Sequence, residues 1–227
     1  MRISNPFRDL TRFEFCLWLF SISSITLSFM FSGGGVLPLT ASLIGVTSLI
    51  FIARGYVFGQ VLTIVFAALY GVISFRFRYY GEMITYLGMT APSAAAAALA
   101  WLRHPYQGTK EVSVHHLSLR QWLLITALCL LVTYAFYHIL TLLGNASLLL
   151  STVSVTTSFL ASALTFFRSP YYALAYAAND VILVGLWLAA SLSDPSGIPM
   201  LVCFSMFLLN DLYGFLSWQR MKKRQAA

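Results

Sequence analysis

Apolar residues fill most of this chain in long blocks. The blocks are separated by short polar or glycine-rich stretches, such as "SGGG" at 32–35 and "SDPSG" at 193–197. Each block has roughly 18–25 residues, the length that an α-helix needs to cross the hydrocarbon core of a bilayer. Pro92 falls within one block, where neighbouring helices can absorb a kink. The pattern predicts an all-α integral membrane protein with eight transmembrane helices, at 13–31, 36–53, 57–75, 80–101, 120–143, 146–167, 171–192 and 199–218.

Composition and charge placement support a membrane protein. Only 9% of the 227 residues are charged and 59% are hydrophobic, whereas soluble domains contain about 25% charged residues. Of the fourteen Lys and Arg residues, all but Arg76 and Arg78 fall on the side of the N-terminus, Arg2 included. This bias predicts that both termini are cytoplasmic. Because the positive charges gather on one side of the predicted membrane, the net charge of +7 indicates a lipid bilayer as partner and no nucleic acid. No small-residue cleavage site follows the first apolar block, so we expect its helix to be retained.

Two three-helix units have similar residues at corresponding helix ends. In each unit the first helix ends at an arginine, Arg54 or Arg168, and the last ends at Trp-x-Arg, beginning at Trp101 or Trp218. One helix between the units makes them parallel, which is a transporter architecture with the solute site near the midplane. The expected division is an N-terminal segment with an extra helix (1–35), a first triplet (36–104), a loop and linker helix (105–145), a second triplet (146–219) and a basic cytoplasmic tail (220–227), in short a 3+1+3 parallel-repeat core.

Polar residues deep in the spans are the candidate site. At 1.5 Å per residue, Asn179 and Asn210 both lie about 12 Å from the cytoplasmic ends of their helices. Each precedes an aspartate, and Trp187 lies two turns beyond Asn179. Helical spacing extends the predicted lining of the second triplet to the whole set Asn179, Asp180, Trp187, Asn210, Asp211, Tyr213 and Trp218. The first triplet offers Gln60, Tyr70, Glu82, Tyr86 and Thr90.

Structural roles compete with these site roles. A buried Asn or Tyr often joins helices within membranes, so either role fits those residues. Intramembrane carboxylates cost several kcal/mol unless they are solvated or paired, which favours function for Asp180 and Asp211. Glu82 could instead pair with Arg78, four residues earlier. Trp101 and Trp218 fit an aromatic belt at the membrane surface.

The deep side chains offer amides, carboxylates and aromatic faces. They suit a small polar solute with hydroxyl groups and a flat, even cationic, ring. A phosphate would find no deep Lys or Arg. Neither a paired nucleophile and base nor a set of metal ligands is evident, so we expect no enzyme, metal or cofactor. A retinal receptor needs a deep lysine, and the chain has none. The "SAAAAALA" run at 93–100 indicates a close-packing helix face that could also join two copies in a homo-oligomer.

The stretches "YYGEMITYLGMTAP" (79–92), "WLRHPYQ" (101–107), "ANDVILVGLW" (178–187) and "MFLLNDLYGFLSWQR" (206–220) resemble the PnuC family of bacterial vitamin B3 transporters. The likeness covers roughly residues 36–220 and includes the 3+1+3 plan, a doubled version of the SWEET plan. It implies a multi-pass protein of the bacterial inner membrane. Asn179, Trp187, Asn210, Asp211 and Tyr213 match motif positions in the second triplet, as Glu82 and Tyr86 do in the first. The first triplet departs from the pattern at Phe66, where the repeat leads one to expect an Asn.

The resemblance implies uptake of nicotinamide riboside by facilitated diffusion, with phosphorylation in the cytoplasm trapping the solute. We expect alternating access, in which the two triplets rock about the site. Thiamine and riboflavin are the alternative solutes, because both also present rings and hydroxyl groups.

Overall fold

The computed structural model describes residues 5–33, 35–145 and 147–226. Arg2 and positions 34, 146 and 227, which enter the predicted charge count and boundaries, lie outside these ranges. In the described chain, eight helical segments are long and apolar enough to cross a membrane. The prediction of eight transmembrane helices is therefore confirmed. The segments are α1 (Arg12–Ser32), α2 (Val36–Ala53), α3 (Val57–Arg76), the composite Tyr80–Arg103, α6 (Leu119–Leu142), α7 (Leu148–Phe166), α8 (Tyr172–Ser193) and the composite Pro195–Ala226.

Local sequence sets several of the helix ends. Thr11 and Glu14 form a capping box at the start of α1, and Ser118 and Gln121 form another at the start of α6. Each box satisfies backbone N–H groups that the first turn of a helix leaves unpaired. Gly33 follows α1 at φ +68°, a left-handed conformation that glycine adopts without steric cost. A short 3₁₀ turn, η1 (Pro6–Asp9), precedes α1.

The fourth span is not one regular helix. It consists of α4 (Tyr80–Ile84), a π-helical turn η2 (Thr85–Thr90) and α5 (Ala91–Arg103). The Ala91 N–H donates to the Tyr86 carbonyl, five residues back. Pro92 explains the irregularity, because proline lacks an N–H and its ring clashes with the carbonyl of the preceding turn. The buried alanines of α5, Ala94, Ala97 and Ala98, lie where α5 packs against α3 and α7 of the same chain.

The last helix is longer than its apolar block. After the 3₁₀ turn η3 (Pro195–Gly197), α9 runs over Ile198–Ala226, whereas the pattern predicted an end at residue 218. Contacts with the loop before α6 hold the extension. Arg224 pairs with Glu111, and the Gln225 side chain accepts from the Val114 N–H at 2.8 Å and donates to the Val112 carbonyl at 3.1 Å. Hydropathy alone could not show these contacts.

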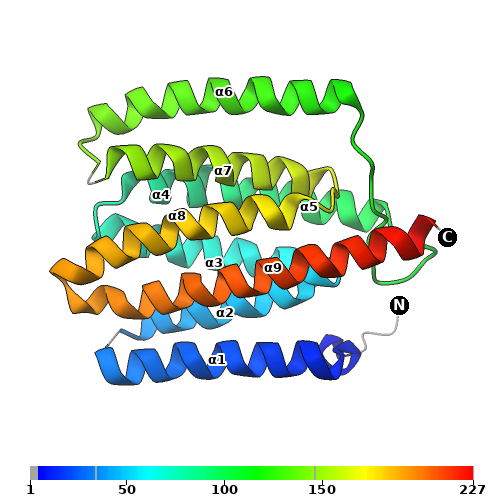
Figure 1. Ribbon diagram of the computed structural model, residues 1–227, viewed down its shortest axis with the longest axis horizontal. Coiled ribbons are helices and arrows are strands. Elements are labelled where there is room, and N and C mark those ends of the chain that lie inside the picture. Colours follow the sequence, from blue (N-terminus) through cyan, green and yellow to red (C-terminus); the bar gives the residue numbers. More distant parts are fainter. Residues whose placement is uncertain (1–4, 34, 146, 227) are drawn as a thin grey trace.

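The helices form a bundle with both ends of the described chain on the same side (Figure 1). The centre is formed by α2, α3, α8 and α9, with α2 packed on both α3 and α9. Gly45 allows that approach, since a Cβ there would lie 2.3 Å from Cζ of Phe207. Helix α6 lies at the edge of the bundle against α7, and α1 covers α2 and α9 on the opposite side. The central helices therefore enclose the site.

Candidate functional site

A small cavity lies among α2, α3, η2, α7, α8 and α9, in the interior of the bundle. Its volume is about 40 Å³. Six candidates from the sequence line it, namely Gln60, Tyr86, Thr90, Asn179, Asp180 and Asp211. All six side chains are buried. Both triplets therefore contribute polar groups to one enclosed space.

Asn179 is oriented by α7. Its Oδ1 accepts hydrogen bonds from Ser154 Oγ and Thr157 Oγ1, each at 2.9 Å. With the oxygen held against α7, the amide nitrogen is the group that can donate to a solute in the cavity. A buried amide with one fixed end is well suited to recognise a hydroxyl or carboxamide oxygen.

Asp180 and Asp211 place two carboxyl groups at the cavity, close enough to interact with each other. Their exposed fractions are only 3% and 4%, and Oδ2 of Asp180 has no hydrogen-bond partner in the described chain. No Lys, Arg or His belongs to the described lining. Electrostatic attraction is stronger in a low-dielectric interior than in water. The cavity therefore favours a cation and disfavours an anion.

The first triplet contributes both aromatic and polar side chains to the lining. Phe66, at the position where the repeat suggested an Asn, lines the cavity. Its ring centroid lies 5.5 Å from that of Tyr70, 5.7 Å from that of Tyr86 and 5.2 Å from that of Phe207. Gln60 adds a buried amide whose Nε2 has no partner among the described residues. Both triplets thus contribute aromatic rings to the lining, while its two carboxyl groups both come from the second triplet.

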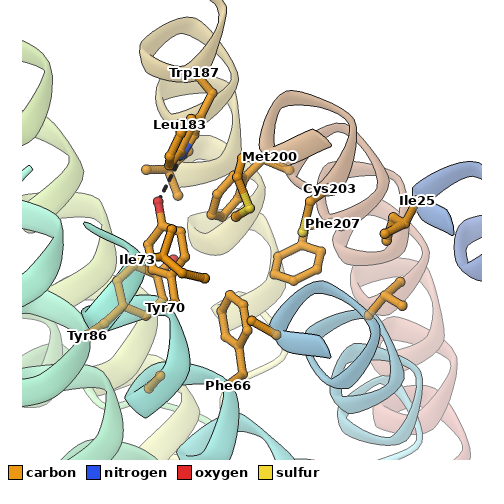
Figure 2. Close-up of a cluster of buried hydrophobic side chains, with 14 of the residues drawn as sticks. Ile25, Phe66, Tyr70, Ile73, Tyr86, Leu183, Trp187, Met200, Cys203 and Phe207 are labelled. Carbon is orange, nitrogen blue, oxygen red and sulfur yellow. Dashed lines mark hydrogen bonds between the residues drawn. The ribbon is translucent and has the colours of Figure 1, made fainter. Parts of the chain in front are cut away.

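Trp187 lies outside this lining and connects the two triplets. Its Nε1 donates to the Tyr70 hydroxyl at 2.9 Å, as Figure 2 shows, and both side chains are fully buried. The rings of Phe77 and Tyr79 pack edge-on against the indole, with centroids at 4.9 and 5.6 Å. In this conformation the indole faces are covered by the protein's own aromatic rings.

Asn210 and Tyr213 contact α1 and are not among the cavity-lining residues. Asn210 Nδ2 donates to Ser21 Oγ at 2.9 Å, and the Tyr213 hydroxyl donates to the Glu14 carboxylate at 2.9 Å. Glu14 also pairs with Arg54 at 2.6 Å. These bonds join α1 to the C-terminal end of α2 and to the middle of α9.

Two of the alternative interpretations are wrong. Trp101 and Trp218 are buried between helices, with ring centroids 5.5 Å apart, and donate to the carbonyls of Thr165 and Ile52. They do not form an exposed aromatic belt. Glu82 is fully buried while Arg78 is exposed, and the two form no ion pair within the described residues.

Part of the lining was not predicted from the sequence. Tyr176 and Tyr172 lie one and two turns, respectively, before Asp180 on α8 and line the cavity with it. This i, i+4, i+8 spacing was a usable signal. Ser48, Thr63 and Thr165 also line the cavity, but small hydroxyl residues are too common in membrane helices to single out. No group of three or more His, Cys, Asp or Glu side chains suited to a metal occurs in the described chain.

Comparisons with known proteins agree with this arrangement. The nicotinamide riboside transporter PnuC of Neisseria mucosa is 28% identical over 222 residues, which cover 95% of this chain and 84% of that protein. The nicotinamide riboside transporter PnuC of Haemophilus influenzae is 22% identical over 190 residues, covering 83% of this chain and 81% of the relative. The crystal structure of the vitamin B3 transporter PnuC superposes with a TM-score of 0.83 at 26% identity, covering 95% of this chain and 94% of that one.

A family model described as nicotinamide mononucleotide transporter matches residues 35–220, which include every residue that lines the central cavity. The match spans most of the chain, and the structural likeness extends over nearly all of it. The chain therefore belongs to the nicotinamide mononucleotide transporter family, the family of the PnuC vitamin B3 transporters.

Proposed function

We propose that this chain takes up nicotinamide riboside across the bacterial inner membrane by facilitated diffusion, with both termini in the cytoplasm. Two relatives carry the name of this solute. The observation that carries the proposal is the acidic pair Asp180 and Asp211 in a buried cavity whose described lining has no basic side chain. Nicotinamide riboside has a fixed positive charge on its pyridinium ring, which these carboxyl groups attract.

The same charge distribution favours the riboside over the mononucleotide. A phosphate group adds about 1.5 to 2 negative charges at neutral pH and needs cationic or N–H partners. The cavity would place that charge beside two carboxyl groups. Although the family is described by the mononucleotide, the lining of this chain therefore fits the dephosphorylated solute.

Each part of the riboside has a matching group. The amides of Asn179 and Gln60 can bind the ribose hydroxyls or the carboxamide. Tyr86, Tyr176 and Phe66 offer aromatic faces to the ring, and such faces also attract a cation. All five side chains line the cavity.

Transport requires the helices to move. The cavity volume of about 40 Å³ is well below the roughly 300 Å³ of a pocket that holds a small organic ligand. The two triplets meet where α2 packs on α9 and α5 packs on α7. Rocking of the triplets at these contacts would enlarge the cavity and open it to one side at a time. This is alternating access, and phosphorylation of the riboside in the cytoplasm would maintain its inward gradient.

Calorimetry on the detergent-purified protein tests the solute. We expect nicotinamide riboside to bind, the mononucleotide to bind at least about tenfold more weakly, and Asp211→Asn to reduce riboside binding by a similar factor. Equal binding of both compounds would contradict the charge argument. In proteoliposomes without pH or sodium gradients, riboside uptake should proceed to equilibrium. A requirement for either gradient would exclude facilitated diffusion.

Thiamine is the second candidate. It carries a fixed positive charge on its thiazolium ring, so the acidic pair favours it over the uncharged riboflavin. Including both vitamins in the same calorimetric series separates these alternatives. Tighter binding of thiamine than of the riboside would retain the site and change the solute.

A further inference from the structure

Glu82 is a buried acidic residue that does not line the central cavity. It lies at the start of α4, at the end of the bundle opposite the chain termini (Figure 1). Its side chain is fully buried, and neither carboxylate oxygen has a hydrogen-bond partner among the described residues. An ionisable residue in this position is costly, and a neutral side chain would be cheaper. Packing alone therefore does not explain its presence.

Hydrogen bonds through Asn145 connect the backbone next to Glu82 with α7. The Gly81 N–H donates to Oδ1 of Asn145 at 3.2 Å, and Nδ2 of Asn145 donates to Ser151 Oγ at 2.9 Å. A Cβ at Gly81 would lie 2.9 Å from Cβ of Ser151. Glu82 is thus enclosed where α4 of the first triplet meets α7 of the second. Separation of the triplets at this seam would expose it.

The surroundings of Glu82 are aromatic. Tyr70, Tyr79 and Tyr86 are near enough to interact with its carboxylate electrostatically. The rings of Tyr70 and Tyr86, both labelled in Figure 2, pack edge-on with centroids 4.4 Å apart. A carboxylate near several tyrosine rings is a suitable environment for an organic cation.

Two neighbouring residues, Tyr86 and Ser154, connect Glu82 with the central cavity. Tyr86 follows Glu82 by four residues, about 6 Å along the helix, and lines the cavity. Ser154 on α7 lies beside Glu82 and directs its hydroxyl to Asn179 Oδ1 at 2.9 Å. A solute moving inward from Glu82 would therefore reach Asn179 and Asp180 next.

We propose that Glu82, with Tyr79 and Tyr86, forms a second binding subsite for an organic cation, at the α4–α7 seam and on the side of the cavity away from the termini. The subsite receives the solute when the seam opens and passes it to Asp180 and Asp211. It selects positive charge before the central cavity recognises the rest of the molecule. The identity of the cation as the transported solute rests on the proposed function.

A charge-removing variant tests the subsite in proteoliposomes. Glu82→Gln keeps the shape of the side chain and removes the negative charge. The two solutes are nicotinamide riboside and its reduced dihydropyridine form, which has the same ribose and carboxamide but no ring charge. We expect Glu82→Gln to raise the KM for the charged riboside about tenfold and to change that for the neutral form less than about twofold. Glu111→Gln, at the surface ion pair with Arg224, is the matched control and should change neither.

A binding measurement keeps this test separate from the proposed solute. 1-Methylnicotinamide, methylated on the ring nitrogen, is a pyridinium cation without ribose, and nicotinamide is its neutral counterpart. Quenching of tryptophan fluorescence measures how much more tightly the protein binds the cation than nicotinamide. We expect Glu82→Gln to reduce this preference and Glu82→Asp to retain it. Retention of the full preference in Glu82→Gln would overturn the subsite. An equal loss of transport for charged and neutral ribosides would also overturn it, because a purely structural role predicts that result. Failure of the unchanged protein to carry the riboside would refute the proposed solute alone.

Discussion

The indole N–H of Trp187 on α8 donates to the hydroxyl of Tyr70 on α3 at 2.9 Å, and both side chains are fully buried. The bond links the second triplet to the first at the level of the aromatic cluster in Figure 2. Because both groups are buried between the triplets, the bond contributes to the stability of this packing.

Replacing Trp187 with Phe removes the donor and leaves the Tyr70 hydroxyl without this partner. We expect the variant to lower the free energy of unfolding by about 1–3 kcal/mol, the usual cost of a buried polar group that loses its hydrogen bond. Adding Tyr70→Phe removes the acceptor as well, so the double variant should lose less than the sum of the single variants. Unfolding transitions in detergent measure the effects. Strict additivity would show that the bond contributes nothing.

The two asparagines of the Asn-Asp pairs should behave differently. Asn179→Ala removes an amide that lines the cavity, and we expect it to weaken riboside binding about tenfold. Asn210→Ala removes the bond to Ser21 on α1, so it should lower thermal stability and leave riboside affinity within about twofold. Calorimetry and thermal unfolding on both variants separate the two effects. A loss of affinity in Asn210→Ala equal to that in Asn179→Ala would place Asn210 in the site.

Glu14 holds three elements together at the end of the bundle that contains the termini. Its carboxylate accepts from Arg54 Nη1 at 2.6 Å, from the Tyr213 hydroxyl at 2.9 Å and from the Thr11 N–H at 2.7 Å. Glu14→Gln should cost about 3 kcal/mol, because it leaves the partly buried Arg54 guanidinium without its counter-charge. Glu111→Gln, which removes a more exposed ion pair, should cost less than about 1 kcal/mol. Equal losses in unfolding experiments would contradict the assigned role of Glu14.

The ion pair between Asp9 and Lys110, at 2.6 Å, should make stability depend on pH. The hydrogen bond from Lys110 lowers the pKa of Asp9 from its ordinary value of 3.8. A lowered pKa in the folded state means that the contribution is complete above the unfolded-state pKa and is lost as pH falls through the folded-state value. Asp9→Asn should therefore lower the melting temperature slightly at neutral pH and have no effect once Asp9 is protonated. A difference that persists at the acid end of the titration would assign the effect to another contact.

Much of the fold follows from the sequence pattern, because a bilayer imposes one length and one hydrogen-bonding solution on every span. The eight blocks therefore correspond to the eight spans. The π-helical turn at Thr85–Thr90 and the continuation of α9 to Ala226 did not follow from that pattern. The first depends on how the helix accommodates Pro92, and the second on contacts with residues 111–114. Neither leaves a signal in hydropathy.

The sequence also determined which residues were candidates, since polar groups are rare and costly at membrane depth. Only the tertiary structure decided which way each one faces. Asn210 and Asp211 are neighbours in the chain, and successive residues on a helix point about 100° apart. Asn210 therefore bonds to α1 while Asp211 lines the cavity with Asp180. Because α1 packs on one side of α9 and the cavity lies on another, the positions of the other helices assign these adjacent residues to different environments.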